Sequence, residues 1–135
     1  MRTLLATVLI AFLGAAGPAP AWTQPAEEEA VVRRVRLSIL EGDARALLSP
    51  ATDRLEVSLF GAQSFYSSAQ AQYVLRDFFK NYPPQRFEVV EVARSGGSQM
   101  VSGRYWHART DQPLHMYVYL ILRGGAWQLE GVRVN

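Results

Sequence analysis

The chain contains no cysteine. This absence excludes disulfide bonds, thiolate zinc sites and cysteine nucleophiles, and it excludes the lipid anchor of bacterial lipoproteins, which is attached to a cysteine. A domain without disulfides in an oxidising compartment must be stabilised by packing alone. The composition allows such a core, because 49% of the residues are hydrophobic.

Long hydrophobic runs are also scarce, with one exception near the N-terminus. Residues 4–13 are predominantly apolar, follow the positively charged Arg2 and precede the small-residue sequence Ala19-Pro20-Ala21. This order is typical of a secretory signal peptide cleaved after Ala21, and cleavage after Ala16 is an alternative. The run is shorter than the roughly 20 residues that span a bilayer, which disfavours an uncleaved anchor. We therefore expect a secreted or periplasmic protein that is not a lipoprotein and keeps no membrane anchor after signal cleavage.

Concentrated charge of one sign is missing from the rest of the chain. Removing the signal peptide, residues 1–21, leaves 114 residues with 13 basic and 12 acidic side chains, which are interspersed along the sequence. Nucleic-acid binding normally requires a clustered basic face, so no nucleic acid is expected as a partner. The remaining length is typical of one domain with a single core. We expect a disordered leader at residues 22–25 and a single domain at residues 26–135.

Apolar residues recur at helical spacing in two parts of this domain. The first helix is expected to end at about residue 40. Three glutamates lie in its first turn, where the helix dipole favours negative charge. Asp43 is placed to cap a second, shorter helix that ends at Leu48. The clearest helix begins with Ser67-Ser68-Ala69-Gln70, which fits a capping box, and ends before Pro83-Pro84.

The remaining segments have the pattern of strands. Residues 54–60 alternate between polar and apolar side chains and are closed by Gly61. Four further strands are expected at residues 86–94, 99–108, 114–123 and 127–134, and Gly-rich or Pro-containing turns join them into an antiparallel meander. Helices in the N-terminal part of the domain and hairpins in its C-terminal part predict an α+β fold, in which N-terminal helices pack on a curved antiparallel sheet.

Two segments resemble a family of secreted bacterial proteins known only as a domain of unknown function. They are the helix sequence Tyr66-Ser67-Ser68-Ala69-Gln70-Ala71 with Val74-Leu75-Arg76-Asp77-Phe78-Phe79, and the closing strands at residues 117–134. The resemblance covers roughly residues 26–134. It implies the cone-shaped α+β fold of the nuclear transport factor two superfamily, whose enzymes use Asp, His or Tyr side chains inside the cone. The family has no assigned activity, so the resemblance does not assign a catalytic residue to this chain.

A cone of this kind can hold a small apolar ligand between its helices and its sheet. The residues expected to line this pocket, with core filling as the alternative, are Tyr73, Phe78, Tyr105, His107, Met116 and Trp127. Acid–base catalysis would require His107 to meet a carboxylate such as Asp77, and spacing alone does not bring the two together. The two histidines, His107 and His115, are not joined by a carboxylate cluster, so neither a metal nor another cofactor is expected.

The predicted strand at residues 114–123 has two different faces. Its aliphatic face, which we expect to pack under the helices, consists of Leu114, Met116, Val118, Leu120 and Leu122. Tyr117 and Tyr119 lie on the other face, and Trp106 lies on the corresponding face of the preceding strand. Rows of exposed aromatic side chains on a sheet usually mark an interface, although cross-strand pairing is the alternative. Members of the superfamily that the chain resembles commonly dimerise through this face, so we expect a homodimer built on Trp106, Tyr117 and Tyr119.

Two functions of different classes follow from these patterns. The first is a non-enzymatic envelope module that binds a small apolar ligand or a protein partner, and the alternative is a lyase or isomerase acting on a hydrophobic substrate in the cone. The enzyme would need an open cavity with His107 and a carboxylate or tyrosine within hydrogen-bond distance. A filled cone with the tyrosine row exposed would favour the interaction module.

Overall fold

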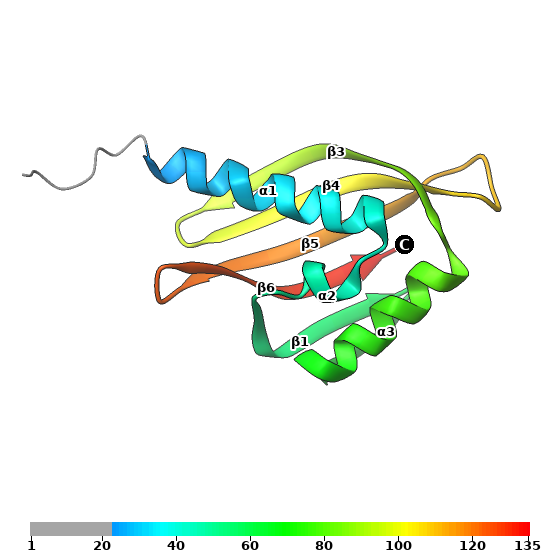
Figure 1. The fold of residues 1–135 in the computed structure, drawn as a ribbon, viewed down its shortest axis with the longest axis horizontal. Helices are drawn as coiled ribbons and strands as arrows, with labels where there is room; N and C mark the ends of the chain where they lie inside the picture. The colour runs from blue at the N-terminus through cyan, green and yellow to red at the C-terminus, as the bar shows by residue number, and fades with distance from the viewer. Residues whose placement is uncertain (1–22) are drawn as a thin grey trace, which may run out of the picture.

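The structure, a computed structural model, describes residues 23–135, so the predicted signal peptide and its cleavage site lie outside it. Figure 1 shows the helices on one face of a single curved sheet. No helix among the described residues is long and apolar enough to cross a membrane. In chain order the elements are α1 (Thr23–Glu41), α2 (Ala44–Leu47), β1 (Ala51–Leu59), β2 (Ala62–Ser67), α3 (Ser68–Asn81), β3 (Pro84–Ser95), β4 (Ser98–His107), β5 (Leu114–Arg123) and β6 (Ala126–Val134).

The six strands follow the order β2-β1-β6-β5-β4-β3. The meander from β3 to β6 is antiparallel as predicted, and so is the β1–β2 hairpin. The pairing of β1 with β6 is parallel, so the sheet is mixed rather than purely antiparallel. The reason lies in the path of the chain. After α3 the chain crosses to the far edge of the sheet and forms β3. Strands β4, β5 and β6 then follow in order back across the sheet, so that β6 lies beside β1 and runs in the same direction.

An additional strand and an earlier helix start are the main differences from the sequence prediction, and β1 and β3 also begin two to three residues earlier than expected. A strand that was not predicted, β2, precedes α3, and it pairs with β1 through a two-residue turn at Phe60 and Gly61, both with positive φ. Helix α1 begins at Thr23, inside the segment expected to be a disordered leader. Pro25 does not prevent this, because the first turn of a helix has no use for the N–H that proline lacks.

Both predicted helix caps are present. The Asp43 side chain accepts a hydrogen bond from the Ala46 N–H at 3.0 Å and caps α2. At the start of α3 the Ser67 hydroxyl accepts from the Gln70 N–H at 3.2 Å, while the Gln70 side chain accepts from the Ser67 N–H at 3.0 Å. These reciprocal bonds satisfy two amides that a helix start otherwise leaves without partners, so the beginning of α3 is defined by its own sequence.

The two faces of β5 are those predicted from its alternation. Met116, Val118 and Leu120 are buried under the helices, whereas Tyr117 and Tyr119 are partly exposed on the opposite face. Leu122 is the exception to the predicted aliphatic face, since it is 41% exposed beside the turn at Gly124 and Gly125. The core therefore lies on one face of the sheet only, and the other face is available for contacts.

Candidate functional site

Most of the residues predicted to line a pocket inside the cone lie in the core. Five of the six side chains, on α3, β4, β5 and β6, are buried: Phe78, Tyr105, His107, Met116 and Trp127. The structure does not bring Tyr73 to them. Tyr73 lies on the outer side of α3, is 65% exposed, and has the Arg76 guanidinium 4.8 Å from its ring centre.

Aromatic rings fill the space between α3 and the sheet. The ring centre of Phe78 is 5.4 Å from that of Tyr105 and 5.2 Å from that of Tyr82. Tyr82 in turn meets His107 edge-on at 5.1 Å. The Tyr105 hydroxyl donates a hydrogen bond to the Tyr82 carbonyl, and burial raises the pKa of Tyr105. These contacts support core filling, the alternative reading of the predicted pocket.

The pair needed for acid–base catalysis is not assembled. His107 Nδ1 accepts a hydrogen bond from the backbone N–H of Arg109 at 3.3 Å. Asp77 is exposed on α3, where its Oδ2 accepts from the Asn81 side-chain amide at 3.3 Å. Because the two side chains have separate partners, this arrangement does not provide a His–carboxylate dyad for a lyase or isomerase.

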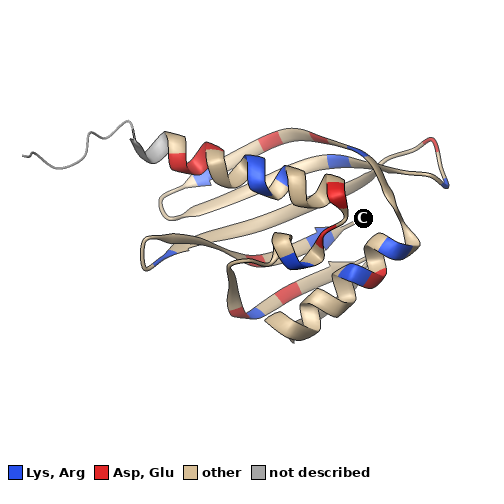
Figure 2. Ribbon diagram, in the orientation of Figure 1, with Lys and Arg blue, Asp and Glu red and all other residues tan. Residues whose placement is uncertain are grey.

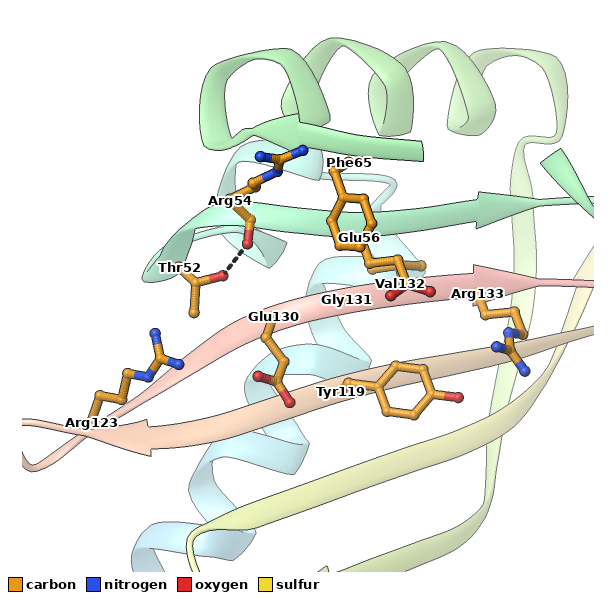
Figure 3. Close-up of a pocket in the computed structure, with 10 residues that line it drawn as sticks. All are labelled: Thr52, Arg54, Glu56, Phe65, Tyr119, Arg123, Glu130, Gly131, Val132 and Arg133. Carbon is orange, nitrogen blue, oxygen red and sulfur yellow. Dashed lines mark hydrogen bonds between the residues drawn. The ribbon is translucent and has the colours of Figure 1, made fainter. Parts of the chain in front are cut away.

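A hollow of about 500 Å³ lies on the outer face of the sheet, where β1 separates from β6 (Figure 3). The two strands pair at Ala51 and Leu129 and again at Glu56 and Gly131, so residues 52–55 of β1 stand opposite the single residue Glu130. Such irregularities bend strands and redirect side chains. The hollow thus lies where the register between β1 and β6 shifts.

The floor of the hollow is formed where Tyr119 lies against Gly131. A Cβ atom on Gly131 would be 3.1 Å from the Glu56 carbonyl oxygen and 3.5 Å from Cδ2 of Tyr119. A side chain at this position would therefore crowd the Glu56 backbone of β1, whereas its distance to the tyrosine ring is that of an ordinary contact. On the opposite wall Phe65 is 52% exposed, with the Arg54 guanidinium 5.1 Å from its ring centre.

Charged groups of both signs surround this aromatic floor. They are Arg54, Glu56, Arg123, Glu130 and Arg133 (Figure 3). Within the part of the chain that the structure describes, the one ion pair joins Arg94 to Glu28 at 3.0 Å and lies elsewhere. The charged groups of the hollow thus form no ion pair with one another, although the Glu56 carboxylate accepts a hydrogen bond from the Gln63 side chain at 2.6 Å. Figure 2 shows that charges of both signs are also spread over the rest of the molecule.

The three residues predicted to form an interface share this outer face. Tyr119 lines the hollow, and Tyr117 lies between Ser102 of β4 and Arg133 of β6. Trp106 lies nearer the far edge, with the Arg86 guanidinium 3.8 Å from its ring centre. All three are partly exposed. The structure thus places all three on the outer face of the sheet, and their role as an interface stays a prediction.

The comparison with protein families settles what kind of chain this is. The model of a domain of unknown function, DUF4783, matches residues 32–135. The chain belongs to the DUF4783 family. No curated protein matches the chain.

Solved structures agree with this membership. A DUF4783 protein from Bacteroides ovatus superposes with a TM-score of 0.70 at 16% identity, covering 75% of this chain and 90% of the other. A second, from Bacteroides uniformis, has a TM-score of 0.71 at 16% identity and covers 76% and 94%. An NTF2-like protein of unknown function from Silicibacter pomeroyi has a TM-score of 0.60 at 14% identity and covers 86% and 98%. The DUF4783 chain thus has the cone-shaped NTF2-like fold that the sequence suggested.

Most of the hollow could not be predicted from the sequence. Arg54 and Glu56 were visible as the polar side of a strand, but nothing local indicated that this strand would lie beside β6 and face Glu130 and Arg133. Among the residues that the structure describes, no three His, Asp or Glu side chains are grouped as a metal site would require.

Proposed function

We propose that this DUF4783 protein is an exported, non-enzymatic interaction module that forms a homodimer through the outer face of its sheet. The observation that carries the proposal is the contrast between the two faces. The candidate pocket residues under the helices are packed against one another, whereas the outer face has a hollow with aromatic walls. A small apolar ligand in the cone would have to displace buried rings, and so would the substrate of a lyase or isomerase.

The charges of the hollow favour a second copy of the chain as the partner. In a two-fold symmetric dimer the same patch contacts itself, so it must supply both members of every ion pair. The hollow meets this requirement, because arginines 54, 123 and 133 stand beside glutamates 56 and 130. Tyr117 and Tyr119 add aromatic surface of the kind that is enriched at interfaces.

The test is the mass of the exported protein in solution. The full chain is expressed with its own N-terminus, the exported product is purified, and its mass is measured by light scattering at micromolar concentration. We expect a dimer, and we expect Tyr119→Lys to convert it to a monomer, because each copy would add a positive charge at the centre of an interface in which arginines already outnumber glutamates. Tyr73→Lys is the matched control, since Tyr73 is exposed on α3 away from this face. A monomeric wild-type protein would overturn the proposal.

A further inference from the structure

The two edges of the sheet are protected to different degrees. The edge strand β3 begins at Pro84, has a register shift between Val89 and Glu91, and is packed against α1. Proline, irregular pairing and a covering helix are all devices that prevent a further strand from pairing. The opposite edge strand, β2, contains no charged residue and no proline, and it pairs with β1 without any shift in register. Helix α3 contacts β2 as well, but β2 has neither a proline nor an irregular pairing that would prevent a further strand from pairing with it.

The backbone of β2 has hydrogen-bonding groups that point away from β1. In a hairpin with a two-residue turn, the flanking residues Leu59 and Ala62 form a hydrogen-bonded pair, and such pairs then recur at every second residue. Gln63 and Phe65 fall between them, so their N–H and C=O groups point to the open edge. Ser67 has the same orientation, and its N–H indeed donates to the Gln70 side chain rather than to β1.

Exposed aromatic side chains occur in the turn before β2, on β2 itself and on α3, the helix that follows it. Phe60 is 50% exposed in the β1–β2 turn, Phe65 is 52% exposed on β2, and Tyr73 is 65% exposed on α3. Phe65 and Tyr73 each have an arginine against the ring, Arg54 at 5.1 Å and Arg76 at 4.8 Å. Within residues 26–135 neither arginine has a carboxylate at ion-pair distance. The open edge thus combines free backbone groups, apolar rings and unneutralised positive charge.

We propose that β2 binds an extended segment of a partner protein in which acidic residues flank an apolar one, and that this segment adds a strand to the edge of the sheet. Backbone bonds to Gln63 and Phe65 would hold the segment, as in other cases of strand addition. Its apolar side chain would lie beside Phe65, and an acidic neighbour would meet Arg54. A second copy fits this edge less well, because two β2 strands would bring two Arg54 guanidiniums to one seam, where like charges repel.

The edge shares Arg54 and Phe65 with the hollow on the outer face, so peptide binding is measured both on the wild-type protein and on the Tyr119→Lys variant designed to be monomeric, which lets either proposal fail alone. The probe is a fluorescein-labelled, N-acetylated peptide, Glu-Val-Phe-Val-Glu, and the control peptide carries Lys in place of Glu. We expect saturable binding of the acidic peptide, with a Kd below about 1 mM, and no binding of the basic one. In NMR spectra the amides of Gln63 and Phe65 should become protected from exchange when the acidic peptide is added.

Two variants separate strand addition from simple charge attraction. Gln63→Pro removes the outward N–H while leaving the ladder to β1 intact, since proline is tolerated on an edge, and we expect it to weaken binding by about tenfold. Gln63→Thr is the matched control, because it also loses the Gln63 side-chain bond to Glu56 at 2.6 Å but keeps the N–H. Arg54→Glu should reverse the preference between the two peptides. Equal binding of both peptides, unchanged binding by Gln63→Pro, or a protein dimer abolished by Gln63→Pro would each contradict the proposal.

Discussion

The ring of Phe87 on β3 covers Gly103 on β4 so closely that a Cβ atom on the glycine would be 2.5 Å from Cζ of Phe87 and 2.7 Å from the Glu88 carbonyl oxygen. Gly103→Ala should therefore destabilise the fold, because the ring and a neighbouring strand would both have to move. We expect a loss of about 1–3 kcal/mol in the free energy of unfolding, measured by urea denaturation.

Gly97→Ala provides the control for this prediction. The nearest atom to a Cβ at Gly97 would be Cβ of Leu122 at 3.7 Å, an ordinary contact. The same change of residue type should then alter the unfolding free energy by less than about 1 kcal/mol. Equal effects at the two glycines would mean that backbone entropy, and not the close approach of Phe87, determines the result.

The capping box of α3 gives a second prediction. Ser67→Ala removes the acceptor for the Gln70 N–H and should lower stability by about 1 kcal/mol, measured by thermal unfolding. Ser68→Ala is the neighbouring control, because Ser68 is the first residue of α3 and the cap is provided by Ser67. The prediction fails if both alanine variants unfold at the same temperature as the wild-type protein.

Features carried by a few neighbouring residues were predictable from the sequence. The cap at Asp43, the box at Ser67 and Gln70, and the inward side of β5 each depend on local spacing, and the structure has all of them. Strand β2 was not predictable in this way, because five of its six residues are exposed and no alternation marks them. A strand without a buried side has no periodicity to detect.

The hollow was beyond sequence reasoning for a different reason. Its walls combine Arg54 and Phe65 from the β1–β2 hairpin with Tyr119 and Arg133 from the end of the meander. These segments meet only because β1 pairs with β6, and the choice of partner strand depends on contacts that are distant in the sequence. The sequence therefore located the outer aromatic residues on β4 and β5 but not the charged groups beside them.

Export of the chain is tested by the N-terminus of the exported product. The predicted signal peptide ends at Ala21, so N-terminal sequencing should begin at Trp22. Replacing Ala21 with a bulky residue such as Leu should slow processing and leave precursor in the membrane fraction. A product that begins at Gly17 would support the alternative cleavage after Ala16, and retention of Met1 would contradict export by cleavage.

Ionic strength provides a test of the dimer that needs no mutation. If arginines and glutamates of the hollow pair across the two-fold axis, raising the salt concentration from about 0.05 M to about 0.5 M should screen them and weaken the dimer several-fold. The measurement is the dissociation constant from sedimentation equilibrium. A dimer that becomes tighter with salt would be held by apolar contacts alone, and the self-complementary charges would have no part in it.

Alkaline pH should destabilise the fold through Tyr105. Burial raises the pKa of this hydroxyl above its ordinary value near 10, so the folded protein holds the proton more tightly than the unfolded chain does. The unfolded chain then binds fewer protons above about pH 10, and by linkage the unfolding free energy must fall as the pH rises further. Urea denaturation at a series of pH values should show a plateau below pH 10 and a decline above it.

Tyr105→Phe isolates this effect from other groups that titrate in base. The variant should be less stable by about 1 kcal/mol at neutral pH, since the Tyr82 carbonyl loses the hydrogen bond that Tyr105 donates. Its stability should nevertheless decline less steeply than that of the wild-type protein above about pH 10, because the group responsible has been removed. Identical slopes in the two proteins would mean that other residues cause the alkaline loss and that the buried hydroxyl does not control it.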